Sequence, residues 1–199
     1  MNLYERSLNY LFNHFGKAMP DSVLLRVRYR TVFHEPLHLK NPKTFNEKIQ
    51  WLKLYDRNPE YHAMADKYAV RAYIGRVLGE KYLIPLLGVW QKAEDIDFKS
   101  LPDQFVLKCT HDSQSIVICH DKAKLDKEEA VRRLGEALKI DYSVLGREWA
   151  YHGIKPCIVA EELLTDESGD DLKDYKVFCF NGEPKFIQVD YDRFKGHKR

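Results

Sequence analysis

The spacing of apolar residues changes near residue 80, and this change constrains the fold more than any other feature of the sequence. Before it, apolar side chains such as Tyr61, Met64 and Tyr68 recur every three or four residues, the period of a helix with one apolar face. After it, short apolar runs follow the two-residue period of strands and are separated by polar turns. We therefore predict an α+β fold, with a helical N-terminal region at residues 1–80 and a sheet-rich region at residues 81–199.

Local signals mark where the helices of the first region begin and end. Thr44 and Glu47 form a capping-box pattern, in which the hydroxyl accepts a backbone N–H and the carboxylate reaches back. The Asn58-Pro59 pair predicts a second helix start, with Pro59 as the first helical residue, and Gly79 predicts its end. Asp66 is a candidate cap for a further helix start inside this segment. An earlier helix is expected over residues 3–15.

The second region is expected to form an antiparallel sheet with one long helix. The helix begins after Asp126, which starts another capping-box pattern. Asn181-Gly182 lies between two strand-like runs and predicts a type I′ hairpin. The expected strands are residues 105–109, 115–119, 157–161, 175–180 and 185–189.

Charge and composition narrow the classes of partner. The chain has 32 basic and 30 acidic residues, a formal net charge of +2, so we expect neither a nucleic-acid nor a membrane partner. The longest apolar stretch, residues 82–90, is too short to span a bilayer. The first residues lack the apolar segment of a signal peptide, so we expect a cytoplasmic protein. The four cysteines have no CxxC spacing and are predicted to be buried, reduced thiols.

One short motif has the residue pattern of a metalloprotease zinc site but is not expected to have its helical structure. Residues 34–38, His-Glu-Pro-Leu-His, have the HExxH pattern, whose chemistry needs both histidines one turn apart on a helix. Pro36 removes a helical N–H and clashes with the preceding turn, so the two histidines are not expected to share a helix. The motif therefore predicts no zinc site.

Charged residues in or next to the predicted strands are the candidates for chemistry. Lys108 lies inside an apolar strand that leads into a polar loop with Ser113 and Ser115, an arrangement that suits phosphate. Two glutamates end the strand at residues 157–161, and Asp174 and Lys176 share one face of a later strand. Each of these features alone is also common on ordinary protein surfaces.

Five sequence elements, taken together and in order, resemble the TupA-like ATP-grasp family of cell-surface polymer biosynthesis. They cover about residues 40 to 199 and include the Asp-Lys-Tyr segment at Lys67 and the Asn-Gly-Glu-Pro segment that ends at Pro184. The resemblance implies an α+β fold in which ATP lies between two lobes, in a cleft flanked by antiparallel sheet. The elements are residues 41–54, 65–71, 101–111, 155–162 and 174–184.

The resemblance also implies a role for each candidate residue. Lys67 would approach the phosphates from the helical side, and Lys108 would hold the α- and β-phosphates while the loop with Ser113 and Ser115 covers them. Glu161, Glu162 and Leu164 would form the hinge that recognises adenine, and Asp174 would contact the ribose. Lys176 and Arg193 are the candidate catalytic groups, which would act on the γ-phosphate or on the acceptor.

Two departures from the family pattern affect the expected activity. Asp112 stands where the family usually has glycine, and it would repel phosphates unless it points away. The acidic Mg²⁺ ligands of the fold are expected farther along than Arg199, and Asp190 and Asp192 do not match them, so the metal ligands stay unassigned. We therefore expect a C-terminally truncated lobe that by itself binds ATP weakly at best and ligates nothing at a useful rate, with self-association or a partner chain as the two ways to complete its cleft.

The function implied is that of an ATP-grasp ligase-like protein, with ATP and Mg²⁺ as cofactors. Such enzymes activate a carboxylate as an acyl phosphate that an amine attacks, here with a uronic-acid polysaccharide or an acidic peptide as acceptor. Two alternatives stay open. One is a glycosyltransferase-like protein of a polysaccharide locus, which would use Asp190-Tyr-Asp192 to hold a metal. The other is a non-catalytic nucleotide-binding accessory protein.

Overall fold

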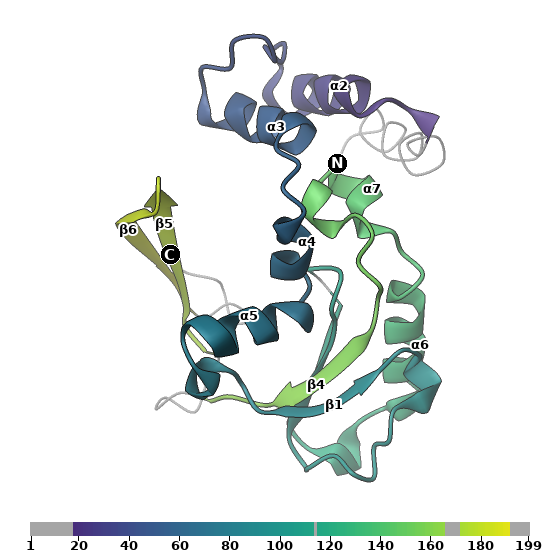
Figure 1. Cartoon of the computed structure of the whole chain (residues 1–199). Coiled ribbons are helices and arrows are strands. Elements are labelled where there is room, and N and C mark those ends of the chain that lie inside the picture. The colour runs from purple at the N-terminus through teal and green to yellow at the C-terminus, as the bar shows by residue number, and fades with distance from the viewer. Residues whose placement is uncertain (1–17, 114, 166–171, 192–199) are drawn as a thin grey trace. The chain divides into compact units, whose positions relative to one another are not determined.

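The computed structural model describes residues 18–113, 115–165 and 172–191 of the chain. It divides into two compact units, residues 1–161 and residues 162–199, which we call the sheet unit and the hairpin unit. The helices of the sheet unit are α2 (Asp21–Phe33), α3 (Phe45–Tyr55), α4 (Glu60–Ala65), α5 (Ala69–Val77), α6 (Lys127–Ala137) and α7 (Tyr142–Gly146), as drawn in Figure 1. The strands are β1 (Leu86–Trp90), β2 (Phe105–Cys109), β3 (Ile116–Cys119), β4 (Ile158–Glu162), β5 (Asp174–Phe180) and β6 (Glu183–Asp190).

The helix boundaries follow the local signals closely. The Thr44 hydroxyl accepts the backbone N–H of Glu47 at 3.2 Å, and the Glu47 carboxylate accepts that of Thr44 at 2.9 Å, which confirms the capping box. The Asn58 side chain accepts from the backbone N–H of Glu60, so α4 begins one residue later than predicted. Gly79 follows α5 with a φ of 103°, a conformation that glycine adopts without strain. The helix predicted for residues 3–15 lies outside the described residues.

The HExxH motif does not lie on a helix. α2 ends at Phe33, and His34 follows it in the left-handed conformation with a φ of 59°. His38 instead contacts the Glu47 carboxylate through its Nδ1 atom at 2.8 Å. This confirms that the two histidines of the motif are not one helical turn apart.

The four strands of the sheet unit form one sheet in the order β1-β4-β2-β3, of which Figure 1 labels the neighbours β1 and β4. β1 pairs antiparallel with β4, and β2 pairs antiparallel with β3. The predicted strands β2, β3 and β4 are confirmed. β1 is an additional strand, and its register with β4 shifts between Leu86 and Gly88, where a bulge accommodates the glycine.

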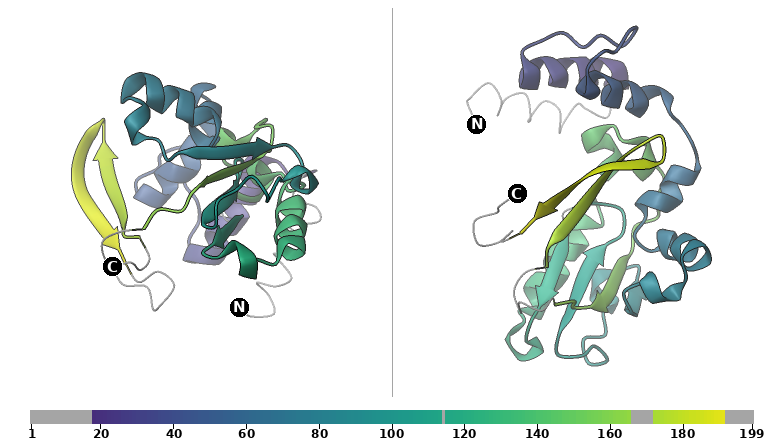
Figure 2. Two further views of the ribbon diagram at one scale, coloured as in Figure 1. Left: turned by 90° about the horizontal axis from the view of Figure 1, so that it is seen from below. Right: turned by 90° about the vertical axis from the view of Figure 1, so that its left-hand side faces the viewer.

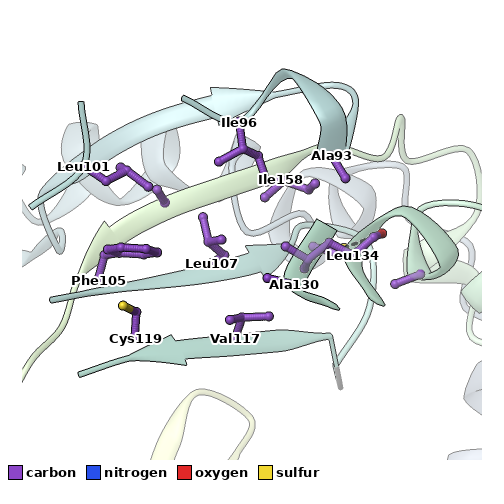
Figure 3. Packing of buried hydrophobic residues seen from close by; sticks show 13 residues of the cluster. Ala93, Ile96, Leu101, Phe105, Leu107, Val117, Cys119, Ala130, Leu134 and Ile158 are labelled. Atoms are coloured by element: carbon purple, nitrogen blue, oxygen red, sulfur yellow. Dashed lines mark hydrogen bonds between the residues drawn. The ribbon is translucent and has the colours of Figure 1, made fainter. Parts of the chain in front are cut away.

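The hydrophobic core lies on one face of this sheet. Alternate residues of β2, Phe105 and Leu107, are fully buried beside Val117 of β3 and Ile158 of β4 (Figure 3). Leu134 and other small apolar residues of α6 cover them. Because successive strand residues point to opposite faces, the residues that alternate with this core point to the other face of the sheet.

The hairpin unit consists of β5 and β6, which pair antiparallel along their whole length (Figure 2). The turn between them is Asn181-Gly182, with φ values of 52° and 82°. Positive φ at both central residues is the signature of a type I′ turn, so the predicted hairpin is confirmed.

No helix among the described residues is long and apolar enough to cross a membrane.

Candidate functional site

Three charged side chains meet on the face of the sheet opposite the core. The Lys108 ammonium donates to one oxygen of the Glu161 carboxylate at 2.7 Å. Arg71 donates to the other oxygen at 3.0 Å and, through its second terminal nitrogen, to the Ile84 carbonyl oxygen at 2.7 Å. The Glu161 side chain is 10% exposed, so it is largely shielded from water. Lys108, Glu161 and Arg71 form what we call the ion triad.

The sequence positions these groups through strand alternation and a helix cap. Lys108 follows the buried Leu107, and Glu161 follows the buried Ala160, so each charge points away from the core. Asp66 accepts the backbone N–H groups of Tyr68 and Ala69, which starts α5 and directs Arg71 towards the sheet. The triad thus joins β2, β4 and α5, which are far apart in the sequence.

Lys67 lies just before α5 and holds the loop that follows β2. Its backbone N–H donates to the Thr110 carbonyl oxygen at 3.1 Å, and its ammonium donates to the carbonyl oxygens of Cys109, at 2.7 Å, and of Asp112. Burial lowers the pKa of the Lys67 ammonium, and the nearby Asp112 carboxylate opposes part of that change. Lys67 is therefore fixed beside the loop that follows Lys108.

The Asp112 carboxylate turns back into its own loop. One of its oxygens accepts the Ser115 backbone N–H at 3.2 Å, and the other accepts the Ser115 hydroxyl. The first oxygen also lies 3.8 Å from the Lys67 ammonium. The negative charge of Asp112 is thus paired inside the loop, and the Ser115 hydroxyl is one of the groups that pair it.

The rest of this loop is tied to the segment after α6. The Ser113 hydroxyl contacts the Tyr142 hydroxyl. His111 Nε2 lies 3.1 Å from the Ile140 carbonyl oxygen, so this nitrogen carries the hydrogen and donates. His111 Nδ1 is buried and has no hydrogen-bond partner among the residues that the structure describes. The loop is therefore anchored at both ends and in the middle.

The hairpin unit carries a second charged group. Asp174 and Asp190 are opposite each other in the β5–β6 register, and the Lys176 ammonium donates to Asp174 at 3.2 Å and to Asp190 at 2.7 Å. Hydrogen bonding to Asp190 raises the pKa of Lys176. Gln188 also donates to Asp190 at 2.7 Å. The first aspartate of the Asp-x-Asp pattern is thus already engaged with two side chains.

The remaining candidate residues are either exposed near the end of β4 or lie outside the described residues. Glu162 and Leu164 are exposed at and after the end of β4. Arg193, predicted to face the γ-phosphate, and Asp192 lie outside the described residues.

The described residues do not fit a Mg²⁺ ion. No three His, Cys, Asp or Glu side chains within residues 18–113, 115–165 and 172–191 are grouped so that they could hold a metal. Asp174 and Asp190 have suitable oxygens, but the Lys176 ammonium lies between them at hydrogen-bond distance from each. A cation at that point would have to displace the lysine.

Arg71 is the member of the ion triad that the sequence did not single out as a candidate. It belongs to the segment 65–71 that carries the resemblance, but nothing local shows that its partner, Glu161, follows 90 residues later. Its position four residues after Lys67 was the available signal, because residues at that spacing share one side of a helix start.

One known protein family matches most of the chain. The model of the family described as TupA-like ATPgrasp matches residues 47–199, which is more than half of the chain. No curated protein and no solved structure matches the chain. The matched segment contains Lys67, Arg71, Lys108 and Glu161.

Proposed function

The chain belongs to the TupA-like ATP-grasp family, and from this membership we propose that it is an ATP-dependent carboxylate–amine ligase with its nucleotide site at the ion triad. The observation that carries the proposal is the meeting of Lys108, Glu161 and Arg71 from three distant elements, with Lys67 beside the adjoining loop. Scattered positions are the expectation for unrelated surface charges.

The lysines supply the positive charge that phosphates require. The Lys108 and Lys67 side chains are 25% and 33% exposed, so both remain accessible although each is already held in place. Lysine binds phosphate as a point charge, and a lysine with a fixed position loses little freedom when it does so. We assign the α- and β-phosphates to Lys108, with Lys67 approaching from the side of α5.

Glu161 supplies a contact that distinguishes adenine from guanine. Its two carboxylate oxygens together offer about four acceptor positions, and the contacts with Lys108 and Arg71 use one on each oxygen. The remaining positions suit the amino group of adenine, which donates. The corresponding oxygen of guanine accepts and would be repelled. We therefore assign adenine to Glu161, with the backbone of Glu162 and Leu164 beside it.

The chemical step that we propose transfers a phosphoryl group from ATP to a carboxylate, and an amine then displaces phosphate from the acyl phosphate. The protein contributes by positioning and by stabilising charge, which are the main terms in such reactions. Lys176 and Arg193 are the proposed groups on the reacting phosphate or acceptor, and Asp174 is the proposed ribose contact. A carboxylated polysaccharide or peptide of a surface polymer is the proposed acceptor class, and the cytoplasm, where ATP is available, is the proposed location.

The test is acceptor-dependent release of ADP from ATP by the purified chain. We expect glucuronate oligomers with an amine donor to stimulate release only slowly, because the described residues do not fit the Mg²⁺ ion on which phosphoryl transfer depends, and we expect Lys108→Ala to abolish the stimulation. Lys92→Ala, at an exposed lysine outside the triad, is the matched control and should change nothing. Stimulated release that survives Lys108→Ala would show that the active nucleotide site lies elsewhere.

A further inference from the structure

A hollow of about 500 Å³ lies between α2 and α3, in a part of the chain that is not assigned to the nucleotide site. Its volume falls within the range of small-molecule pockets. None of its lining residues belongs to the ion triad or to the loop after β2. The hollow is lined by Arg26, Leu37, His38, Leu39, Lys40, Asn41, Lys43 and Glu47.

The charges around the hollow are unbalanced. Arg26, Lys40 and Lys43 are cationic at neutral pH, and none of them forms an ion pair with an acidic side chain within the part of the chain that the structure describes. Arg26 instead donates to the Leu37 carbonyl oxygen at 2.9 Å, which fixes its guanidinium at the wall. In the same sheet unit, Lys67, Arg71 and Lys108 all have acidic partners.

The one acid in the lining does not neutralise these cations. The Glu47 carboxylate accepts the backbone N–H groups of Lys43 and Thr44 at 2.9 Å and that of His38 at 3.3 Å. It also accepts from the Thr44 hydroxyl and contacts His38 Nδ1. Glu47 is buried, so its oxygens are occupied by groups that build the wall. The hollow therefore keeps a net positive lining.

We propose that this hollow binds a sugar acid, and that it serves as a docking subsite for the acidic acceptor of the ligase. The cations suit a carboxylate, and the exposed Asn41 amide suits the hydroxyl groups of a sugar, while Leu37 and Leu39 are buried beneath the floor of the hollow. A sugar acid uses both the cations and the amide, whereas the carboxylate of an acidic peptide side chain uses the cations alone. This proposal rests on the proposed function in one respect, namely that the sugar acid bound in the hollow is the acceptor of the ligase.

The test measures binding of a glucuronate tetramer to the full chain by calorimetry, in the absence of ATP. The variant is Lys40→Gln/Lys43→Gln, since both lysines are exposed and neither builds the wall through its side chain. The matched control is Lys92→Gln/Lys99→Gln, at two exposed lysines outside the hollow. We expect the first variant to weaken binding by about tenfold or more, the control to leave it unchanged, and added salt to weaken it in the wild type.

Comparison ligands decide what the hollow recognises. A neutral glucose tetramer and inorganic phosphate should bind much more weakly than the glucuronate tetramer. Equal binding of the neutral sugar, tighter binding of a glutamate tetramer, or no loss in the lysine variant would each overturn the proposal. Because ATP is absent, these outcomes do not depend on Lys108, and failure of the ligase assay with intact glucuronate binding would refute the proposed function alone.

Discussion

The sheet of the sheet unit and the β5–β6 hairpin both consist of strands rich in apolar residues, but these residues are mostly buried in the sheet and mostly exposed in the hairpin. In β2, four of five residues are buried, and Phe105 is fully inaccessible. In β5, six of seven residues are exposed, including Phe178 and Phe180, and Phe186 of β6 is 56% exposed. Alternation and turn residues therefore specify that a strand forms, whereas a covering element such as α6 determines whether its apolar side chains are buried.

The charged groups of the two regions differ in the same way. The ion triad has two cations around one largely buried carboxylate and joins three elements. The group on the hairpin has two carboxylates around Lys176; the Asp190 side chain is 4% exposed, but the side chains of Lys176 and Asp174 are 46% and 40% exposed, more than those of any member of the triad. Ion pairs shielded from water resist screening by salt, so the triad should depend on its exact partners more strongly than the hairpin group does.

The largest expected effect is on stability, and it compares one substitution in the two regions. Phe105→Ala should lower the free energy of unfolding by about 3–5 kcal/mol, because it leaves a cavity in a fully packed core. Phe186→Ala should cost less than about 1.5 kcal/mol, since it loses mainly ring contacts with Phe178 and Phe180. Urea denaturation of both variants measures the difference. If Phe105→Ala does not fold, Phe105→Leu replaces it, and equal losses in the two regions would contradict the comparison.

The next effect concerns Arg71 as a residue that positions Glu161. Arg71→Lys keeps the charge but cannot reach both Glu161 and the Ile84 carbonyl oxygen, so it should lose a charge-assisted hydrogen bond worth about 1.5 kcal/mol. We expect the Kd for ATP to rise about tenfold and the preference for ATP over GTP to fall. Arg132→Lys is the control, because Arg132 also makes two contacts, with Glu129 and Glu136, but is exposed on α6. An unchanged nucleotide preference in Arg71→Lys would leave Arg71 with a structural role only.

A smaller effect is expected on the acid limb of the stability curve. Backbone hydrogen bonds from Thr44 and Lys43 lower the pKa of Glu47 from 4.5 to about 2. A carboxyl whose pKa is lower in the folded state stabilises the fold above its unfolded pKa, and that contribution disappears as the pH falls through the folded pKa. Glu47→Gln should therefore flatten the loss of stability between about pH 5 and pH 2. Glu183→Gln, on the exposed hairpin, should not, and an equal change in both would contradict the comparison.

The smallest effect leaves stability untouched and reports on exposure alone. Burial raises the pKa of the Cys109 thiol to about 12 and also raises those of Cys119 and Cys157. Cys179, in the hairpin, is exposed. A thiol-specific reagent at pH 8 should therefore label Cys179 rapidly and the three sheet-unit thiols only after denaturation. Rapid labelling of Cys109 in the native protein would show that the core opens more readily than the packing implies.

Local sequence signals predicted the elements well. The capping box needs only hydrogen bonds between Thr44 and Glu47, and the hairpin turn needs only positive φ values at Asn181 and Gly182. Both features could therefore be predicted without knowledge of the fold. β1 was missed because Gly88 interrupts its apolar pattern, and only pairing with β4 makes it a strand. The antiparallel sheet was predicted because β2, β3 and β4 each carry a strong run of apolar residues.

Features that depend on distant residues could not be predicted in the same way. The resemblance placed Lys67, Lys108 and Glu161 in one site, but it did not show that Arg71 holds Glu161 or that Asp112 is paired within its loop. The hollow between α2 and α3 needs Arg26 from one helix and Lys40 and Lys43 from the following loop. Contacts of this kind follow from tertiary packing, which a pattern in one segment does not contain.

The most direct test of the nucleotide site is calorimetric binding of ATP and GTP to the purified chain and to two variants. We predict that the wild type binds ATP more tightly than GTP, and that Lys108→Met weakens ATP binding by about tenfold or more, the effect of losing one charge-assisted phosphate contact. Lys92→Met, at an exposed lysine outside the triad, should bind as the wild type does. Equal ATP affinity in the wild type and in Lys108→Met would contradict the assignment of the nucleotide to the ion triad.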